Sequence, residues 1–93
     1  MAEYTIIFTE SYERRAKKFF KKHPDLISQY EKCLQLLEAN PFHPSLRLHS
    51  LQGKLRGLSS ISITLNCRLS MEFLINKKEI LPIDVGSHDE VYS

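Results

Sequence analysis

The sequence predicts an α+β domain in which a helical hairpin covers one face of a mainly antiparallel sheet. The 93-residue chain has room for one modest core, because a chain of this size buries roughly 65% of the surface it exposes when unfolded. Apolar residues recur with a helical period in the first half and with a period of two from Ile61 onward. The apolar faces of two helices can pack on one face of such a sheet, so we expect the element order β-α-α-β-β-β.

The first half of the chain predicts one strand and two helices. Residues 4–8 are β-branched and aromatic, as in a strand. Thr9 or Ser11 can cap a helix that ends before Pro24, because the residue before a proline is disfavoured in the α region. Pro24 suits the first turn of a second helix, which residues 40–44 stop. The predicted buried stripes are Tyr12, Ala16, Phe19 and Phe20, then Leu26, Tyr30, Cys33, Leu34 and Leu37.

The second half predicts strands with one buried face and one wet face. Apolar and polar residues alternate strictly over residues 61–75. A single strand would be far too long, so we expect a turn near residues 65–66. Residues 76–78 predict a second turn before a last strand over residues 79–85. The inward side chains of that strand are expected to be Leu81, Ile83 and Val85. The opposite face of the sheet is expected to be polar and open to a ligand.

Composition argues against several classes of protein. Cys33 and Cys67 have no CxxC spacing and no neighbouring ligand cluster, so we expect buried reduced thiols and neither a metal nor a cofactor. No apolar run is long enough for a membrane span, and the start of the chain lacks the layout of a signal peptide. We therefore expect one cytoplasmic domain over residues 1–93.

The basic residues are unevenly distributed, although the net charge is only +2. One group lies in the first predicted helix, and a second surrounds a histidine near mid-chain. This distribution predicts a positive region on the surface, which is either a simple solvated face or an attraction for RNA phosphates. The two groups are Arg14, Arg15, Lys17, Lys18, Lys21 and Lys22, and then Arg47, Lys54, Arg56 and Arg68.

Two polar motifs carry the candidate chemistry. His49 begins the segment His-Ser-Leu-Gln-Gly, and His88 lies in the segment Gly-Ser-His-Asp-Glu-Val-Tyr that ends at Tyr92. Each motif lies at the end of a predicted strand, so the folded sheet could bring both imidazoles to one cleft. Such a pair would form an acid–base site without a metal. A lone histidine at a strand end is more often only a surface residue.

The sequence resembles the RelE/ParE superfamily of toxin–antitoxin toxins, in particular its YafQ branch. The resemblance is carried by these two motifs, by the Leu-Arg-Gly-Leu-Ser-Ser-Ile segment at residues 55–61 and by the Arg68-Leu69 step. The resemblance extends over nearly the whole chain, with the specific motifs in the second half. It implies a RelE-like fold and a small toxin that enters the ribosomal A site and cuts mRNA. It also implies a cognate antitoxin that blocks this activity.

The resemblance places catalytic histidines at His49 and His88, and an aromatic at Tyr92 that could contact a base or simply anchor the end of the chain. RNA cleavage without a metal needs a base, an acid and cations that hold the phosphate. Arg68 could clamp a phosphate, or instead form a salt bridge with Glu72 or Asp84. Lys54 and Arg56, in an expected loop around Gly53 and Gly57, could add contacts to the RNA backbone or could serve only ordinary solubility.

Three residues depart from the family pattern. Ser60, Ser62 and Asn66 stand where the YafQ branch has acidic and histidine site residues. Their side chains can support a site by hydrogen bonding, but they do not carry charge or shuttle protons at neutral pH. The departure favours an alternative, a weakened or non-enzymatic member that acts through an antitoxin or, like ParE, on DNA gyrase. A general RNA-binding module is less favoured, because the chain lacks interleaved aromatic residues.

Overall fold

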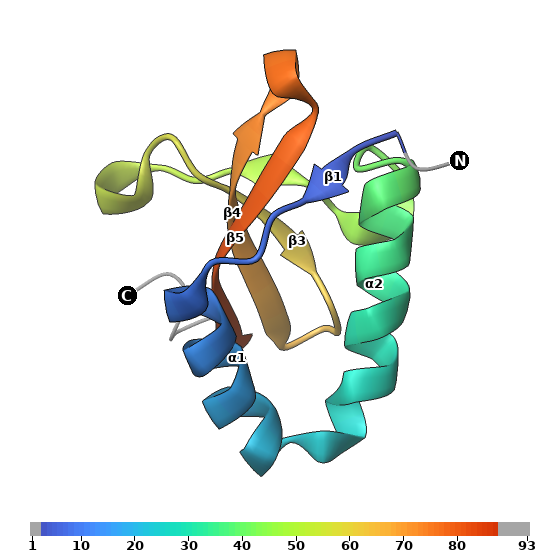
Figure 1. The fold of residues 1–93 in the computed structure, drawn as a ribbon, viewed down its shortest axis with the longest axis vertical. Coiled ribbons are helices and arrows are strands. Elements are labelled where there is room, and N and C mark those ends of the chain that lie inside the picture. The colour runs from blue at the N-terminus through green and yellow to red at the C-terminus, as the bar shows by residue number, and fades with distance from the viewer. Residues whose placement is uncertain (1–2, 88–93) are drawn as a thin grey trace.

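A five-stranded sheet organises residues 3–87, the part of the chain that this computed structural model describes (Figure 1). The order across the sheet is β1-β5-β4-β3-β2, with β1 parallel to β5 and every other neighbouring pair antiparallel. This architecture confirms the predicted α+β class. The strands are β1 (Thr5–Ile6), β2 (His49–Ser50), β3 (Ser59–Ser62), β4 (Cys67–Leu74) and β5 (Glu79–Ser87).

The two helices, α1 (Glu10–Lys22) and α2 (Ile27–Ala39), are joined by a 3₁₀ turn over Pro24–Leu26. The Thr9 hydroxyl accepts a hydrogen bond from the amide of Tyr12 at 3.2 Å, so the first of the two predicted caps is the one used. Both helices pack on the same core as the sheet (Figure 1). Within residues 3–87, no helix is long and apolar enough to cross a membrane.

The core lies between the helices and one face of the sheet. Both predicted helical stripes reach it, since Tyr12, Phe20, Cys33 and Leu37 are buried. The sheet contributes fully buried apolar side chains, and both cysteines are buried thiols, as predicted. The apolar sheet residues with 0% exposure are Ile61, Leu69, Met71 and Ile80.

The last strand differs from its predicted inward face. Ile80, Pro82 and Val85 are buried, whereas Leu81 and Ile83 are half-exposed, so the prediction was right for Val85 alone. The cause is a register shift: Ser70 of β4 pairs with Asp84 while Met71 pairs with Pro82, which leaves Ile83 as an extra residue. Such a bulge reverses the alternation of faces between the two halves of a strand.

Two further differences come from the short elements. The first strand covers only Thr5–Ile6, and the sheet gains a strand, β2, that the sequence did not predict. Leu65 and Ile75 share the alternation of the buried residues, yet they are 75% and 61% exposed because they lie in turns. Both turns fall where they were predicted, at residues 63–66 and 75–78.

A hydrogen bond between two tyrosines joins the helices. The hydroxyl oxygens of Tyr12 on α1 and Tyr30 on α2 are 2.7 Å apart, and Tyr12 is 1% exposed. Burial and the neighbouring Tyr30 raise the pKa of Tyr12 well above its ordinary value, and burial likewise raises the pKa of Tyr30. Both phenols therefore keep their protons in the folded protein at a pH where the unfolded chain loses them.

The unfolding free energy should fall as the pH rises above about 10, by up to about 1.4 kcal/mol per pH unit from the buried Tyr12 and by less from the partly exposed Tyr30. Tyr12→Phe should lose stability at pH 7, because it removes a buried hydrogen bond, but should show a shallower decline at alkaline pH. Urea denaturation of both proteins across this range tests the prediction. Parallel curves for wild type and variant would contradict it.

Candidate functional site

The face of the sheet away from the core carries a row of polar residues, one from each of four strands. His49 of β2 pairs with Ser60 of β3, which pairs with Ser70 of β4, which pairs with Asp84 of β5. Directly opposed residues point to the same side of a sheet, so the four side chains share one face. His49, on the edge strand β2, therefore lies at one end of this polar row.

A second row brings Arg68 to the same face. Ser62 pairs with Arg68, and Arg68 pairs with Gly86, each two residues along its strand from the first row. Given the usual strand spacing and rise per residue, the Cα atoms of His49 and Arg68 lie roughly 12 Å apart. Two long side chains at that separation can reach opposite sides of one phosphodiester.

The ring of His49 is oriented by the backbone. Its Nδ1 lies 3.1 Å from the carbonyl oxygen of Arg47, and because a carbonyl only accepts, Nδ1 carries the proton in this hydrogen bond. The neutral ring then presents Nε2 as its proton acceptor. Arg47 has the left-handed backbone (φ 52°) that ends the 3₁₀ turn Pro44–Leu46, an orienting contact that sequence patterns do not signal. His49 is exposed and borders a hollow of about 270 Å³.

Arg68 has an unsatisfied donor. Its side chain is half-buried, and its Nε atom is buried with no hydrogen-bond partner among residues 3–87. In the same part of the chain it forms no ion pair with Glu72 or Asp84, and the Asp84 carboxylate instead accepts from the amide of Val85 at 2.9 Å. An unpaired buried N–H costs about 1–3 kcal/mol, so an anion's oxygen at this position would be stabilised.

The middle of this face is closed, whereas the sequence predicted an open one. Ser60 and Ser70 are 0% and 2% exposed, because short side chains on inner strands are surrounded by their neighbours. The Ser70 hydroxyl donates to the carbonyl of Asp84 at 3.4 Å, and the Ser62 hydroxyl oxygen is buried without a partner within residues 3–87. Asn66 is exposed in the turn between β3 and β4.

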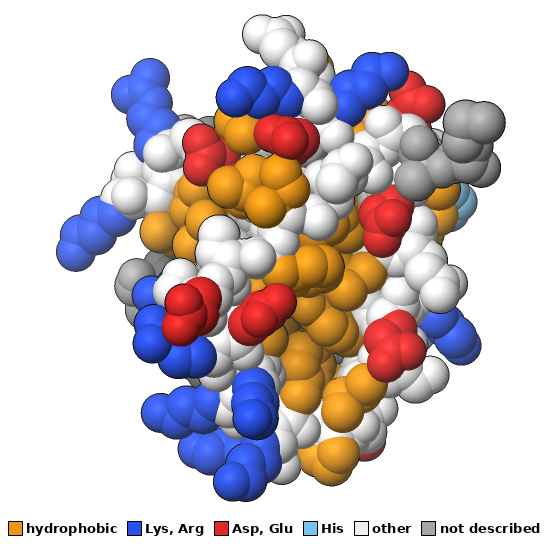
Figure 2. Space-filling model, viewed as in Figure 1, with side chains coloured by type: hydrophobic (Ala, Val, Ile, Leu, Met, Phe, Trp, Pro, Cys, Tyr) orange, Lys and Arg blue, Asp and Glu red, His pale blue; other side chains and the backbone are white. Residues whose placement is uncertain are grey.

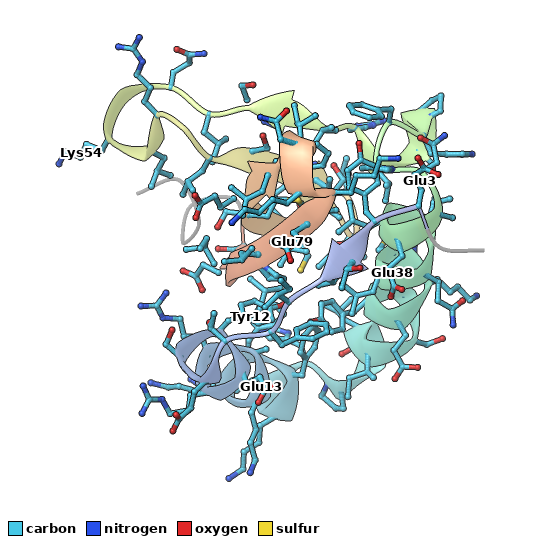
Figure 3. The ribbon with its side chains drawn as sticks, turned by 45° about the horizontal axis from the view of Figure 1, so that its top comes forward. Glu3, Tyr12, Glu13, Glu38, Lys54 and Glu79 are labelled. Atoms are coloured by element: carbon cyan, nitrogen blue, oxygen red, sulfur yellow. The ribbon has the colours of Figure 1, made fainter. Side chains whose placement is uncertain are left out.

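The remaining candidates are spread out or undescribed. Lys54 and Arg56 are exposed in a loop next to β2, and Figure 3 shows Lys54 pointing away from the body of the protein. The loop needs glycine at Gly53 (φ 68°) and Gly57 (φ 98°), where the backbone is left-handed. His88 and Tyr92 lie outside the described residues. The structure therefore brings together His49 and Arg68, with Ser60 and Ser62 between them.

The basic helix is a second candidate surface. Figure 2 shows Lys and Arg side chains gathered over α1. Arg15, Lys18 and Lys22 line a hollow of about 310 Å³ beside Asp84. Residues 3–87 contain no group of three or more His, Cys, Asp or Glu side chains placed to hold a metal ion.

Solved structures share this fold across almost the whole chain. YafQ from E. coli strain BL21(DE3) has a TM-score of 0.78 and 17% sequence identity, covering 97% of this chain and 99% of its own. The E. coli DinJ-YafQ toxin-antitoxin complex gives a TM-score of 0.76 at 19% identity, covering 98% and 99%. A YoeB/ParE toxin from Agrobacterium tumefaciens gives 0.72 at 15%, covering 90% and 98%. No protein-family model and no curated protein sequence matches. The chain therefore has the fold of the RelE/ParE toxins.

Proposed function

We propose that this protein is the toxin of a type II toxin–antitoxin system, and that it cleaves ribosome-bound mRNA by acid–base chemistry without a metal. The observation that carries the proposal is the sheet register, which places His49 and Arg68 on one face. The shared fold with YafQ supports it. A base and a phosphate-holding cation are two of the three elements that this reaction needs.

In the proposed reaction, Nε2 of His49 takes the proton of a ribose 2′-hydroxyl, and the 2′-oxygen attacks the adjacent phosphorus. The bond from phosphorus to the 5′-oxygen breaks, and His88 gives that oxygen a proton. The products are a 2′,3′-cyclic phosphate, or its hydrolysis product, and a 5′-hydroxyl. His88 follows Ser87, the last residue of β5, and the resemblance of its motif to the RelE/ParE toxins supports its assignment to the reaction.

The guanidinium of Arg68 would hold the non-bridging phosphate oxygens, with its unpaired Nε as one donor. Lys54, Arg56 and Tyr92 would position the RNA strand, and Ser60, Ser62 and Asn66 would give polar support without transferring protons. The basic residues of α1 would attract ribosomal RNA phosphates regardless of sequence.

The proposed protein partner is a cognate antitoxin in the cytoplasm, by analogy with the DinJ-YafQ complex. Apolar side chains that such a partner could cover are exposed near the edge strand β1, where Ile7 and Phe8 are 36% and 43% exposed. Figure 2 shows an apolar band down the middle of one face of the molecule, with acidic side chains along its borders. An antitoxin that covers the apolar side chains near β1 would stabilise the complex through contacts at the opposite edge of the sheet from His49.

Induction of the protein in bacterial cells tests the proposal. We expect growth arrest and new 5′ ends within a reporter message in primer extension. Both effects should disappear in His49→Ala and His88→Ala, because each variant lacks a proton-transfer group. They should persist in His43→Asn, which changes an exposed histidine but keeps a side-chain acceptor for the amide of Ser45. Unchanged message ends in the wild-type protein would exclude the nuclease.

A second function is favoured by the uncharged residues Ser60, Ser62 and Asn66 at the family's site positions. Ser60 is the strongest case, because its fully buried side chain is out of reach of a substrate. In that case the protein acts through protein contacts, either on DNA gyrase or as a weakened toxin. Arrest that survives the double change His49→Ala/His88→Ala, with altered supercoiling and intact messages, would select gyrase. Absence of any toxicity would select the weakened toxin.

A further inference from the structure

Two adjoining hollows at the end of α1 share the side chains of Phe19 and His23. The first has a volume of about 340 Å³ and lies between the end of α1 and the β3–β4 turn, next to the end of β5 (Figure 1). The second, of about 310 Å³, is the basic hollow beside Asp84. One hollow is mainly apolar and the other is cationic, so together they offer two different kinds of binding surface side by side.

The apolar hollow suits a flat heteroaromatic ring. The rings of Phe19 and His23 are stacked at 4.5 Å with an interplanar angle of 30°, and Leu26 and the buried Cys67 add apolar surface. Asn66 lines the same hollow, and its side chain is exposed. A carboxamide offers donors and an acceptor together, which matches the polar edge of a nucleobase.

The cationic hollow suits a phosphate. Arg15, Lys18 and Lys22 are spaced i, i+3 and i+7, which places them on one face of α1. The guanidinium of Arg15 donates to the carbonyl of Ile83 at 3.0 Å, which fixes it against β5. The single carboxylate of Asp84 leaves the hollow with an excess of positive charge.

We propose that the two hollows together bind one nucleotide of single-stranded RNA, with the base against Phe19 and His23 and an adjoining phosphate against Arg15, Lys18 and Lys22. The proposal rests on the proposed function for its choice of RNA. Cys67 and Ser87, which pair with each other, line the base hollow, and Arg68 follows Cys67 directly. Cys67 and Arg68 point to opposite faces of β4, so an RNA strand that occupies both the base hollow and the Arg68 site would pass around the end of the sheet, and the bound base would contribute to sequence preference.

Binding of a fluorescent 2′-O-methyl RNA oligomer to the full-length protein tests the base hollow. This probe lacks the 2′-hydroxyl nucleophile, so it binds without being cleaved. The wild-type protein should bind it more tightly than an abasic oligomer of equal length, since stacking of one base changes affinity by roughly 5-fold or more. His23→Ala and Asn66→Ala should each reduce this preference, and His43→Ala should retain it.

A matched pair of variants on α1 tests the phosphate hollow. Lys18→Gln/Lys22→Gln removes two cations that line it, whereas Lys17→Gln/Lys21→Gln removes two exposed cations that do not. The first variant should lower the slope of log affinity against log salt by roughly 0.7 for each phosphate that the protein no longer neutralises, and the second should leave the slope nearly unchanged.

Two results would overturn the subsite: equal losses of affinity for the two lysine pairs, or base preference that survives both His23→Ala and Asn66→Ala. Circular dichroism of each variant separates weaker binding from unfolding. Because the probe is not cleaved, its binding tests the proposed subsite independently of the proposed nuclease activity. Specific binding without message cleavage in cells would retain the subsite and reject the nuclease. Message cleavage without base-dependent binding would retain the nuclease and reject the subsite.

Discussion

Replacing His49 with glutamine should lower the rate of mRNA cleavage by roughly 10²- to 10⁴-fold, the usual contribution of a positioned general base. Glutamine retains a polar side chain but cannot take a proton at neutral pH. His49 is exposed on a two-residue edge strand, so the change should leave the fold intact. Single-turnover cleavage of a message on isolated ribosomes measures the effect without interference from product release.

The Arg68 variants provide the comparison for this experiment. Arg68→Lys keeps the positive charge but loses the fork of donors that includes the unpaired Nε, so it should lower cleavage while partly preserving ribosome binding. Exposed His43 is the control, and His43→Asn, which keeps a side-chain acceptor for the amide of Ser45, should cleave like the wild-type protein. Cleavage by His49→Gln at the wild-type rate would remove His49 from the reaction, and the general base would have to be sought elsewhere.

The long elements of this fold were predictable because their patterns are strong. Both helices and the β3–β4 hairpin follow from the spacing of apolar residues, and the stops at Pro24 and at residues 40–44 are backbone effects of proline. Strand β2 was missed because two residues carry no period, and its pairing with β3 is a tertiary effect. The bulge that places Ile83 out of register directly follows Pro82, a residue that strands tolerate mainly at edges and bulges, whereas the alternation of apolar residues shows no break there and gave the wrong inward face.

The candidate site was predictable in its residue types more than in its surroundings. The common face of His49 and Arg68 agrees with the expectation of one polar face, and the missing ion pair of Arg68 within residues 3–87 favours the phosphate clamp over the salt bridge. The burial of Ser60 depends on its neighbours in space, which a single sequence does not give. The hollow that His23 and Asn66 both line could not be predicted from the sequence, because it depends on how the end of α1 packs against the β3–β4 turn.

Replacing Leu69 with alanine should destabilise the protein by about 3–5 kcal/mol, the range for a fully buried leucine whose cavity cannot collapse. Leu69 is 0% exposed in the middle of β4, where it pairs with Ile61 on one side and Val85 on the other. These two neighbours belong to strands that are hydrogen-bonded to β4, so they cannot move inward to fill the space. Because domains have about 5–15 kcal/mol of stability in total, this one change should leave the fold marginal.

Leu65 provides the matched control, since it is a leucine on the same hairpin that is 75% exposed. Leu65→Ala should change the unfolding free energy by about 0.5 kcal/mol or less, because it removes little buried surface. Urea denaturation of the two variants measures the difference directly. If Leu69→Ala lowered the unfolding free energy by less than about 1 kcal/mol, the sheet and helices would have to relax around the cavity. The prediction that β3, β4 and β5 hold the core rigid would then be wrong.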